Sequence, residues 1–388
     1  MLILFMLSFL IGLSTGIITF IFGTGLNLIS NFIILAFPYN LVLLPLVGLL
    51  TIVLRDRFKS EVNGSMPRIF HATRKDDELS ILIIPFQFLT TWFAHLAGAS
   101  VGREGVAVQL GATTSNVIAT KFPDLDRTVM TRIGMAAGFA GLFGTPLAAT
   151  VFCFEVTKKK AIKLEVLGAT LIATFTANII SAALGLNHFH VETVFKMFTF
   201  REMIFFIFCI LAFATVGHLF ALLLARAKDA NNNFKINDYQ KVFILSVIGA
   251  LLIYIINDGR YMSLGTNIIN DAFYNPQNIH GLDFAFKTLL TVYFVSIGFQ
   301  GGEVTPLFAI GSSLGVVLSY IFVLPYQIVG AIGYAFVFGN ATNAYFASAV
   351  LVIEVFGFAV MPYAFIALVI TLFIRNDSHT IYPNLDWE

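Results

Sequence analysis

The chain has 388 residues, of which 58% are hydrophobic and only 12% are charged, and its formal net charge is +1. Soluble domains carry roughly 25% charged residues, so this composition excludes an ordinary soluble protein and indicates a chain embedded in the lipid bilayer. The net charge close to zero gives no reason to expect a nucleic-acid partner.

Apolar segments follow one another along the whole chain, and an α-helix needs roughly 20 apolar residues to cross the bilayer. They cover, in order, residues 2–24, 26–54, 79–100, 104–120, 129–156, 161–186, 202–225, 241–257, 282–299, 304–324, 326–338, 344–356 and 358–374. Several are too short for a straight span or are broken by Gly and Pro, which is tolerated in a membrane only where the break is buried or lines a cavity. We therefore predict an all-α polytopic membrane protein with about ten or more spans, some of them partial.

The distribution of basic residues predicts the orientation, because segments rich in Lys and Arg face the cytoplasm. These segments are Arg55–Lys59, Lys121–Arg132, Lys158–Lys163 and Arg226–Lys241. The segments 187–200 and 257–280 are then expected on the outer side. We expect a multi-pass protein of the cell membrane.

The two halves of the chain resemble each other at an offset of 199 residues. This offset pairs Pro146–Val156 with Tyr345–Val355, and it also pairs Gly102–Glu104 with Gly301–Glu303. One offset at two separate places favours internal duplication over a chance likeness of apolar segments, and duplication with interrupted helices is typical of transporters. The polar run Ala230–Asn237 is the predicted linker, which gives halves of about 1–229 and 238–388.

Three Gly-containing interruptions are candidate anion sites: Asn63–Pro67, Gly102–Gly105 and Gly301–Pro306. The second and third directly precede apolar, helix-like runs. A helix start leaves free N–H groups and a partial positive charge that together bind an anion. Any one interruption could instead be a kink or a close helix contact, but three of them, two with carboxylates, favour an anion site.

Glu104 is the sharpest functional candidate. A charged side chain at the bilayer centre costs about 3 kcal/mol on insertion scales, so it should be solvated, paired or protonated there. A carboxylate beside anion-binding amides would compete with the anion, and its protonation would release the site and couple anion movement to proton movement. The alternative is a structural ion pair between Arg103 and Glu104.

Gly102-Arg-Glu-Gly105 resembles the gating motif of CLC channels and antiporters. Further resemblances are Leu282–Gly315 with Lys287, Ala136–Glu155, and Tyr382 near the C-terminus. The resemblance implies a CLC-type fold of inverted, related halves with broken helices at mid-membrane. It also implies a homodimer that needs no cofactor. We expect a single transmembrane domain over residues 1–388, without a cytoplasmic regulatory domain, in a bacterial inner membrane.

Departures from the chloride-type motifs at Asn63–Pro67 and Gly302–Pro306 resemble the fluoride/proton antiporter branch of that family. The implied roles are Glu104 as the proton-coupled gate and Phe70 as a pore aromatic, although Phe70 could equally be a core or lipid-facing residue. The implied anion-binding residues are Asn63, Gly64, Ser65, Met66, Gly102, Arg103, Gly105, Val106, Glu303, Val304, Thr305 and Tyr382. Fluoride is strongly hydrated, so removing its water requires several close donors of the kind that this set offers.

Two glutamates are set apart by the repeat. Glu155 and Glu354 occupy matching positions and are predicted to be structural helix-end partners. Chloride/proton exchangers resembling this chain carry an inner glutamate near Glu155, and the next residue here is Val156. An inward proton path would then need another group or water.

The expected function is export of fluoride in exchange for protons, which would confer fluoride resistance. One alternative is a chloride channel or chloride/proton exchanger. A remote alternative is an intramembrane enzyme that uses the pair Glu104 and Glu303, or Ser313 as nucleophile. HExxH, P-loop and CxxC patterns are absent from the sequence, His188-x-His190 lacks a clear third ligand, and no metal site is predicted. Cys153 and Cys209 are predicted to be buried and free.

Overall fold

The computed structural model describes residues 1–58, 65–157, 163–376 and 380–382. The helices before residue 187 are α1 (Leu2–Ala36), α2 (Leu43–Arg57), α4 (Ser65–Ala72), α5 (Ile83–Leu96), α6 (Glu104–Ala119), α7 (Arg127–Phe143), α8 (Pro146–Thr157) and α9 (Leu164–Ala183). Those after residue 199 are α10 (Phe200–Asn232), α11 (Asp238–Ile255), α12 (Thr266–Tyr274), α13 (Asp283–Ser296), α14 (Val304–Phe322), α15 (Tyr326–Thr342), α16 (Tyr345–Phe356) and α17 (Met361–Phe373). Short 3-10 turns join some of them, and the described residues contain no strand.

The helices differ in length, and several are too short for a straight span, as the apolar pattern predicts. Within the described residues, six helical stretches are long and apolar enough to cross a membrane, the longest being α1 with 35 residues. Helices α8 and α16 have only 12 residues each, about 18 Å of helix, so they cannot span a bilayer core of about 30 Å. The apolar runs 2–24 and 26–54 do not correspond to two separate helices, because α1 continues to Ala36 and ends before Pro38.

The two halves have the same order of helices, but the boundary between them is not where the sequence predicted it. Helix α10 corresponds to α1 and runs to Asn232, across the start of the predicted linker Ala230–Asn237. It packs on α15 of the second half, where Gly217 lets the backbones approach. The helix order favours a boundary in the segment that follows α9, residues 187–199.

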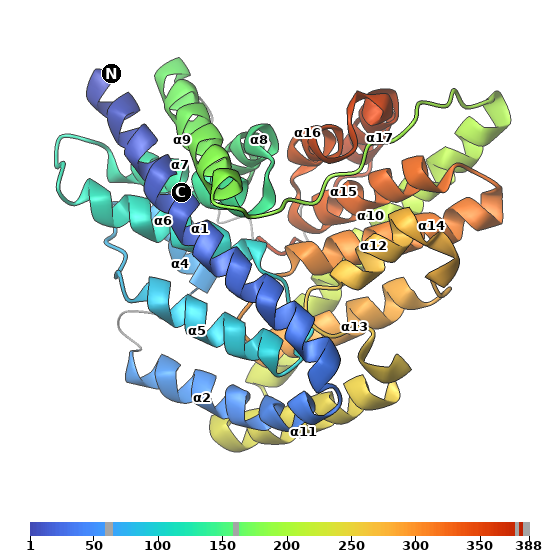
Figure 1. Cartoon of the computed structure of the whole chain (residues 1–388), viewed down its shortest axis with the longest axis horizontal. Helices are drawn as coiled ribbons and strands as arrows, with labels where there is room; N and C mark the ends of the chain where they lie inside the picture. The colour runs from blue at the N-terminus through green and yellow to red at the C-terminus, as the bar shows by residue number, and fades with distance from the viewer. Residues whose placement is uncertain (59–64, 158–162, 377–379, 383–388) are drawn as a thin grey trace.

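Reciprocal helix capping joins the halves at α8 and α16, which lie side by side (Figure 1). The carboxylate of Glu155, near the end of α8, accepts backbone N–H bonds from Phe346 and Ala347 at 3.0 and 2.9 Å. Glu354, near the end of α16, accepts bonds from Leu147 and Ala148 at 2.9 and 2.7 Å. Each glutamate thus satisfies the free N–H groups at the start of the other helix, which confirms the predicted helix-end role. The pairing also makes the two helices antiparallel.

Close helix contacts through glycine recur in both halves. A Cβ at Gly111 of α6 would lie 2.1 Å from the carbonyl oxygen of Gly134 on α7, and one at Gly311 of α14 would lie 2.0 Å from that of Gly333 on α15. Small residues allow this backbone contact between membrane helices, where packing rather than the hydrophobic effect holds helices together.

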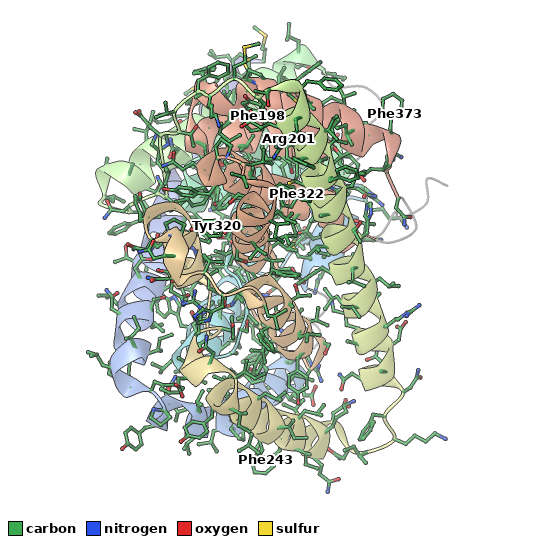
Figure 2. The ribbon with its side chains drawn as sticks, turned by 90° about the vertical axis from the view of Figure 1, so that its right-hand side faces the viewer. Phe198, Arg201, Phe243, Tyr320, Phe322 and Phe373 are labelled. Atoms are coloured by element: carbon green, nitrogen blue, oxygen red, sulfur yellow. The ribbon has the colours of Figure 1, made fainter. Side chains whose placement is uncertain are left out.

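The outer surface carries large apolar side chains. Figure 2 shows Phe243, Tyr320 and Phe373 pointing outward from three different helices, and they are 43%, 58% and 86% exposed. Many other large apolar side chains are exposed as well, which is unusual for a soluble protein, so these side chains are placed to meet lipid.

The glycine contacts generate a prediction with a matched control in the same helix pair. Gly311→Ala should lower the free energy of unfolding by about 1–3 kcal/mol, because the new methyl group must push two backbones apart. Gly330→Ala should be neutral or stabilising by up to about 1 kcal/mol, because the nearest atom, in the ring of Phe273, is 3.5 Å away. Thermal unfolding of the two variants in detergent measures the difference. Equal midpoints would contradict the packing argument.

Candidate anion site

Two helices begin side by side at the centre of the molecule. An antiparallel bridge joins Gly102, just before α6, to Gly302, just before α14. The N–H of Gly302 donates to the carbonyl oxygen of Gly102 at 3.0 Å, and the N–H of Gly102 donates in return to the carbonyl oxygen of Gly302. A Cβ on Gly102 would lie 2.7 Å from that second oxygen. Glycine is therefore needed for this approach, which brings two positive helix ends together.

The bridge corrects the register of the repeat at this point. Because Gly102 pairs with Gly302, the residue that opens α14, Val304, is the counterpart of Glu104, and Glu303 is the counterpart of Arg103. The offset is 200 here and returns to 199 at α7 and α15, since the second half is one residue shorter in between. Glu104 and Glu303 are thus not equivalent carboxylates.

The carboxylate of Glu104 is fully buried and rests on the start of α14. The Thr305 N–H donates to Oε2 at 3.0 Å and the Thr305 hydroxyl donates to Oε1 at 2.6 Å. The N–H of Arg103 is 3.3 Å from Oε2. A side-chain carboxylate therefore occupies donors that could otherwise hold a free anion.

Arg103 contributes less to holding this carboxylate than Thr305 does. Its Nε lies 3.5 Å from Oε1 of Glu104, and its Nη1 donates to Oδ1 of Asn27 on α1 at 3.2 Å. The Arg103–Glu104 pair considered from the sequence exists, but it is longer than both contacts with Thr305.

Tyr382 and Phe70 come to the same region from opposite ends of the chain. The N–H of Ile381 donates to the carbonyl oxygen of Ala341 at 2.9 Å and fastens the C-terminal segment to the end of α15. Tyr382 is then buried, with its ring 5.2 Å from the ring of Phe70 on α4. It interacts electrostatically with Glu303 and Glu104, so the structure gathers these predicted residues around one place.

The remaining residues predicted to bind the anion do not all lie in the described part of the chain or face the same region. Asn63 and Gly64 are outside the described residues, and Ser65 is the first residue of α4. Met66 is half-buried against the main apolar core. Val106 packs into a separate apolar cluster with residues of α1, so only its backbone N–H, free in the first turn of α6, is available to an anion. Gly105 has the same free N–H.

An aromatic wall beside the site was not predicted from the sequence. Tyr334 is fully buried and interacts electrostatically with Glu104. Its ring stacks on Phe308 at 4.2 Å, Phe308 contacts Phe338 at 5.4 Å, and Phe152 links Phe338 to Tyr382. The edges of such rings carry partial positive charge, so the wall is apolar without repelling an anion. The high Phe content hid these positions from sequence reasoning.

The enzyme and metal alternatives find no support in this geometry. The hydroxyl of Ser313 bonds to the carbonyl oxygens of Ala309 and Ile310 in its own helix, as a buried serine in a helix commonly does. His188 contacts the carbonyl oxygen of Gly141. Within the described part of the chain, no group of His, Cys, Asp and Glu side chains is placed to hold a metal ion.

Residues 46–376 match the family model described as the voltage gated chloride channel. The chain belongs to this family, the CLC family. The chain is 32% identical over 310 residues to the chloride/fluoride channel protein of Pseudomonas syringae pv. tomato, covering 76% of this chain and 67% of that protein.

Two solved CLC structures share the fold. A CLC-type fluoride/proton antiporter matches with a TM-score of 0.94 and 39% identity, over 98% of this chain and 96% of that one. A slow cyanobacterial Cl⁻/H⁺ antiporter matches with a TM-score of 0.83 and 21% identity over the same shares, which shows the fold alone. The chain is a multi-pass membrane protein of the CLC fold, with two related halves, as the sequence predicted.

The Thr305 hydroxyl generates a prediction for this CLC site. Thr305→Val should weaken anion binding about threefold to tenfold, because one donor worth about 0.5–1.5 kcal/mol is lost. Thr305→Ser keeps the hydroxyl and should bind like the wild type. Calorimetric titration with halide salts in detergent measures the difference. If the Val and Ser variants bound equally well, the hydroxyl would not be a ligand.

Proposed function

We propose that the protein is a secondary antiporter that exports fluoride in exchange for protons and thereby protects the cell from fluoride. The observation that carries the proposal is the position of the Glu104 carboxylate on the Thr305 N–H and hydroxyl. One set of donors can serve either Glu104 or an external anion, but not both at once.

Proton coupling follows from this competition. A charged carboxylate accepts the donors of Thr305 and blocks the site. When Glu104 is protonated it loses its charge and holds those donors more weakly, so an anion can take its place beside α14. When the anion leaves, Glu104 can return only by giving up its proton. Each anion that passes is thereby tied to protonation of one side chain.

Several features favour fluoride over a larger, weakly hydrated anion. Stripping water from a small, basic anion requires several close donors. The Thr305 N–H and hydroxyl supply two at one buried place, and we assign the first N–H groups of α6 and the Tyr382 hydroxyl as further donors. Glu303 adds a second carboxylate nearby, which can carry protons or accept a bond from a hydroxyl. The fluoride/proton antiporter at 39% identity over 98% of this chain supports the same choice.

Measurements of anion efflux distinguish fluoride antiport from the chloride alternative. Liposomes containing the purified protein are loaded with fluoride or with chloride, and efflux is followed with ion-selective electrodes. We expect fluoride efflux to exceed chloride efflux by at least about tenfold, equivalent to about 1.4 kcal/mol. A preference for chloride would instead assign the protein to chloride transport.

Glu104→Gln tests the assigned role of the carboxylate. The amide has the shape of a protonated carboxyl group but cannot ionise, so fluoride efflux should continue while its link to protons is lost. A pH-sensitive dye inside the liposomes measures proton uptake in parallel with the fluoride electrode. Glu155→Gln, which changes a structural glutamate, is the matched control and should retain coupled uptake. Proton uptake that persisted at the wild-type ratio in Glu104→Gln would remove Glu104 from this role.

The homodimer expected from the family resemblance is part of the proposal. Arg103 and Thr305 contact Glu104 from the same chain, and in the proposed dimer each subunit would hold its own pathway. Counting photobleaching steps of singly labelled protein in liposomes tests the oligomeric state. We expect two steps per particle, and a single step would contradict the dimer.

A further inference from the structure

The peptide group between Gly102 and Arg103 lies between Glu104 and His95, a residue near the end of α5. Its N–H is directed at the Glu104 carboxylate, 3.3 Å from Oε2. Its carbonyl oxygen accepts from the N–H of Gly302 at 3.0 Å and lies 3.2 Å from Nε2 of His95. In a trans peptide the N–H and C=O point in opposite directions, so whatever holds the carbonyl also aims the N–H at the site.

His95 can hold this carbonyl only in one tautomer. A carbonyl oxygen is purely an acceptor, so Nε2 must carry the hydrogen. Nδ1 then has a free lone pair, and the hydroxyl of Ser263 lies 2.7 Å from it as the donor. The Gly102 carbonyl thus fixes the tautomer, and the Ser263 hydroxyl satisfies the lone pair that this leaves on Nδ1. His95 and Ser263 are both buried.

Ser263 is itself held in place by buried groups. Its N–H donates to the carbonyl oxygen of Ala99 at 3.1 Å, and its carbonyl oxygen accepts from the ammonium of Lys287 at 2.7 Å. The backbone of Ser263 has a φ of +54°, a left-handed conformation that costs a non-glycine residue free energy and needs such fixed partners.

Lys287 holds Ser263, the hydrogen-bond partner of His95, in place. Its ammonium also donates to the carbonyl oxygen of Tyr261 at 3.1 Å and to the hydroxyl of Ser100 at 2.9 Å. All three donors of the buried ammonium are therefore used.

We propose that His95 is a positioning residue of the anion site, which orients the Gly102–Arg103 peptide so that the Arg103 N–H donates to Glu104 or to the anion that replaces it. The transport measurement below rests on the proposed function. The binding measurement does not, because it applies to any halide. His95 acts through the peptide and touches neither the carboxylate nor the anion. Loss of the imidazole leaves the peptide held by Gly302 alone, so the site loses affinity, whereas the maximal transport rate changes less.

The test compares His95→Leu with His95→Gln. Leucine fills the space without a donor, whereas glutamine places an amide N–H near the position of Nε2. Binding of fluoride and chloride salts is measured by calorimetry in detergent, and KM and kcat for fluoride are measured in liposomes. We expect His95→Leu to raise the dissociation constant and KM about threefold to tenfold, with kcat within about twofold of the wild type. His95→Gln should recover most of the lost affinity.

Two further variants keep the result interpretable. Ser263→Ala should give a smaller rise in KM, because His95 remains but its ring loses the hydrogen bond that holds Nδ1 in place, and this variant serves if His95→Leu does not fold. Thr90→Val removes a buried hydroxyl of α5 that donates to the Phe86 carbonyl oxygen of its own helix, and it should leave binding unchanged.

The proposal is overturned if His95→Leu and Ser263→Ala bind halides as the wild type does, or if His95→Gln is as weak as His95→Leu. A loss of thermal stability with unchanged KM would show a purely structural role and would also overturn it. If wild-type liposomes carried no fluoride, the proposed function would fail, yet the calorimetric comparison would still decide the role of His95.

Discussion

The structure depends on one constraint: a carboxylate in the interior of a membrane must find hydrogen-bond donors there, because a lone charge is costly in that environment. Backbone N–H groups at helix starts supply these donors without adding further charge. The Gly102–Gly302 bridge places two such starts together, and Glu104 rests on one of them. The short helices, the glycine contacts and the duplication all serve to bring helix starts into the interior.

Among the described residues, Glu104, Glu155 and Glu354 each rest on the start of a different helix from their own, with different consequences. Glu155 and Glu354 each accept two backbone N–H bonds and join α8 to α16. These contacts give Glu155 and Glu354 a structural role. Glu104 differs because Tyr382 interacts electrostatically with it and with a second carboxylate, Glu303, and because we propose that a mobile anion competes for its donors. The fold thus uses one physical device both to assemble the halves and to build the site.

The sequence predicted the membrane class and the duplication, because these depend on composition and on motifs that can be read locally. The grouping of Glu104, Thr305 and Tyr382 was implied by the resemblance to the CLC family. Sequence reasoning missed the register at Gly302, since two adjacent glycines allow two alignments and only the backbone bridge distinguishes them. The sequence analysis placed the boundary at Ala230–Asn237 because a polar run looks like a linker. The first residues of this run instead form the last part of α10. His95 could not be found, because its partner Ser263 is distant in sequence and neither residue belongs to a motif.

The account makes Glu104 the point where fluoride and protons exchange, and fluoride-driven proton uptake by the wild-type protein in liposomes tests this most directly. Vesicles loaded with fluoride are diluted into fluoride-free buffer of the same pH, with the membrane potential clamped by potassium and valinomycin. The account predicts that fluoride leaving the vesicles drives protons in and acidifies the interior until the fluoride gradient is spent. Fluoride efflux without acidification would contradict it.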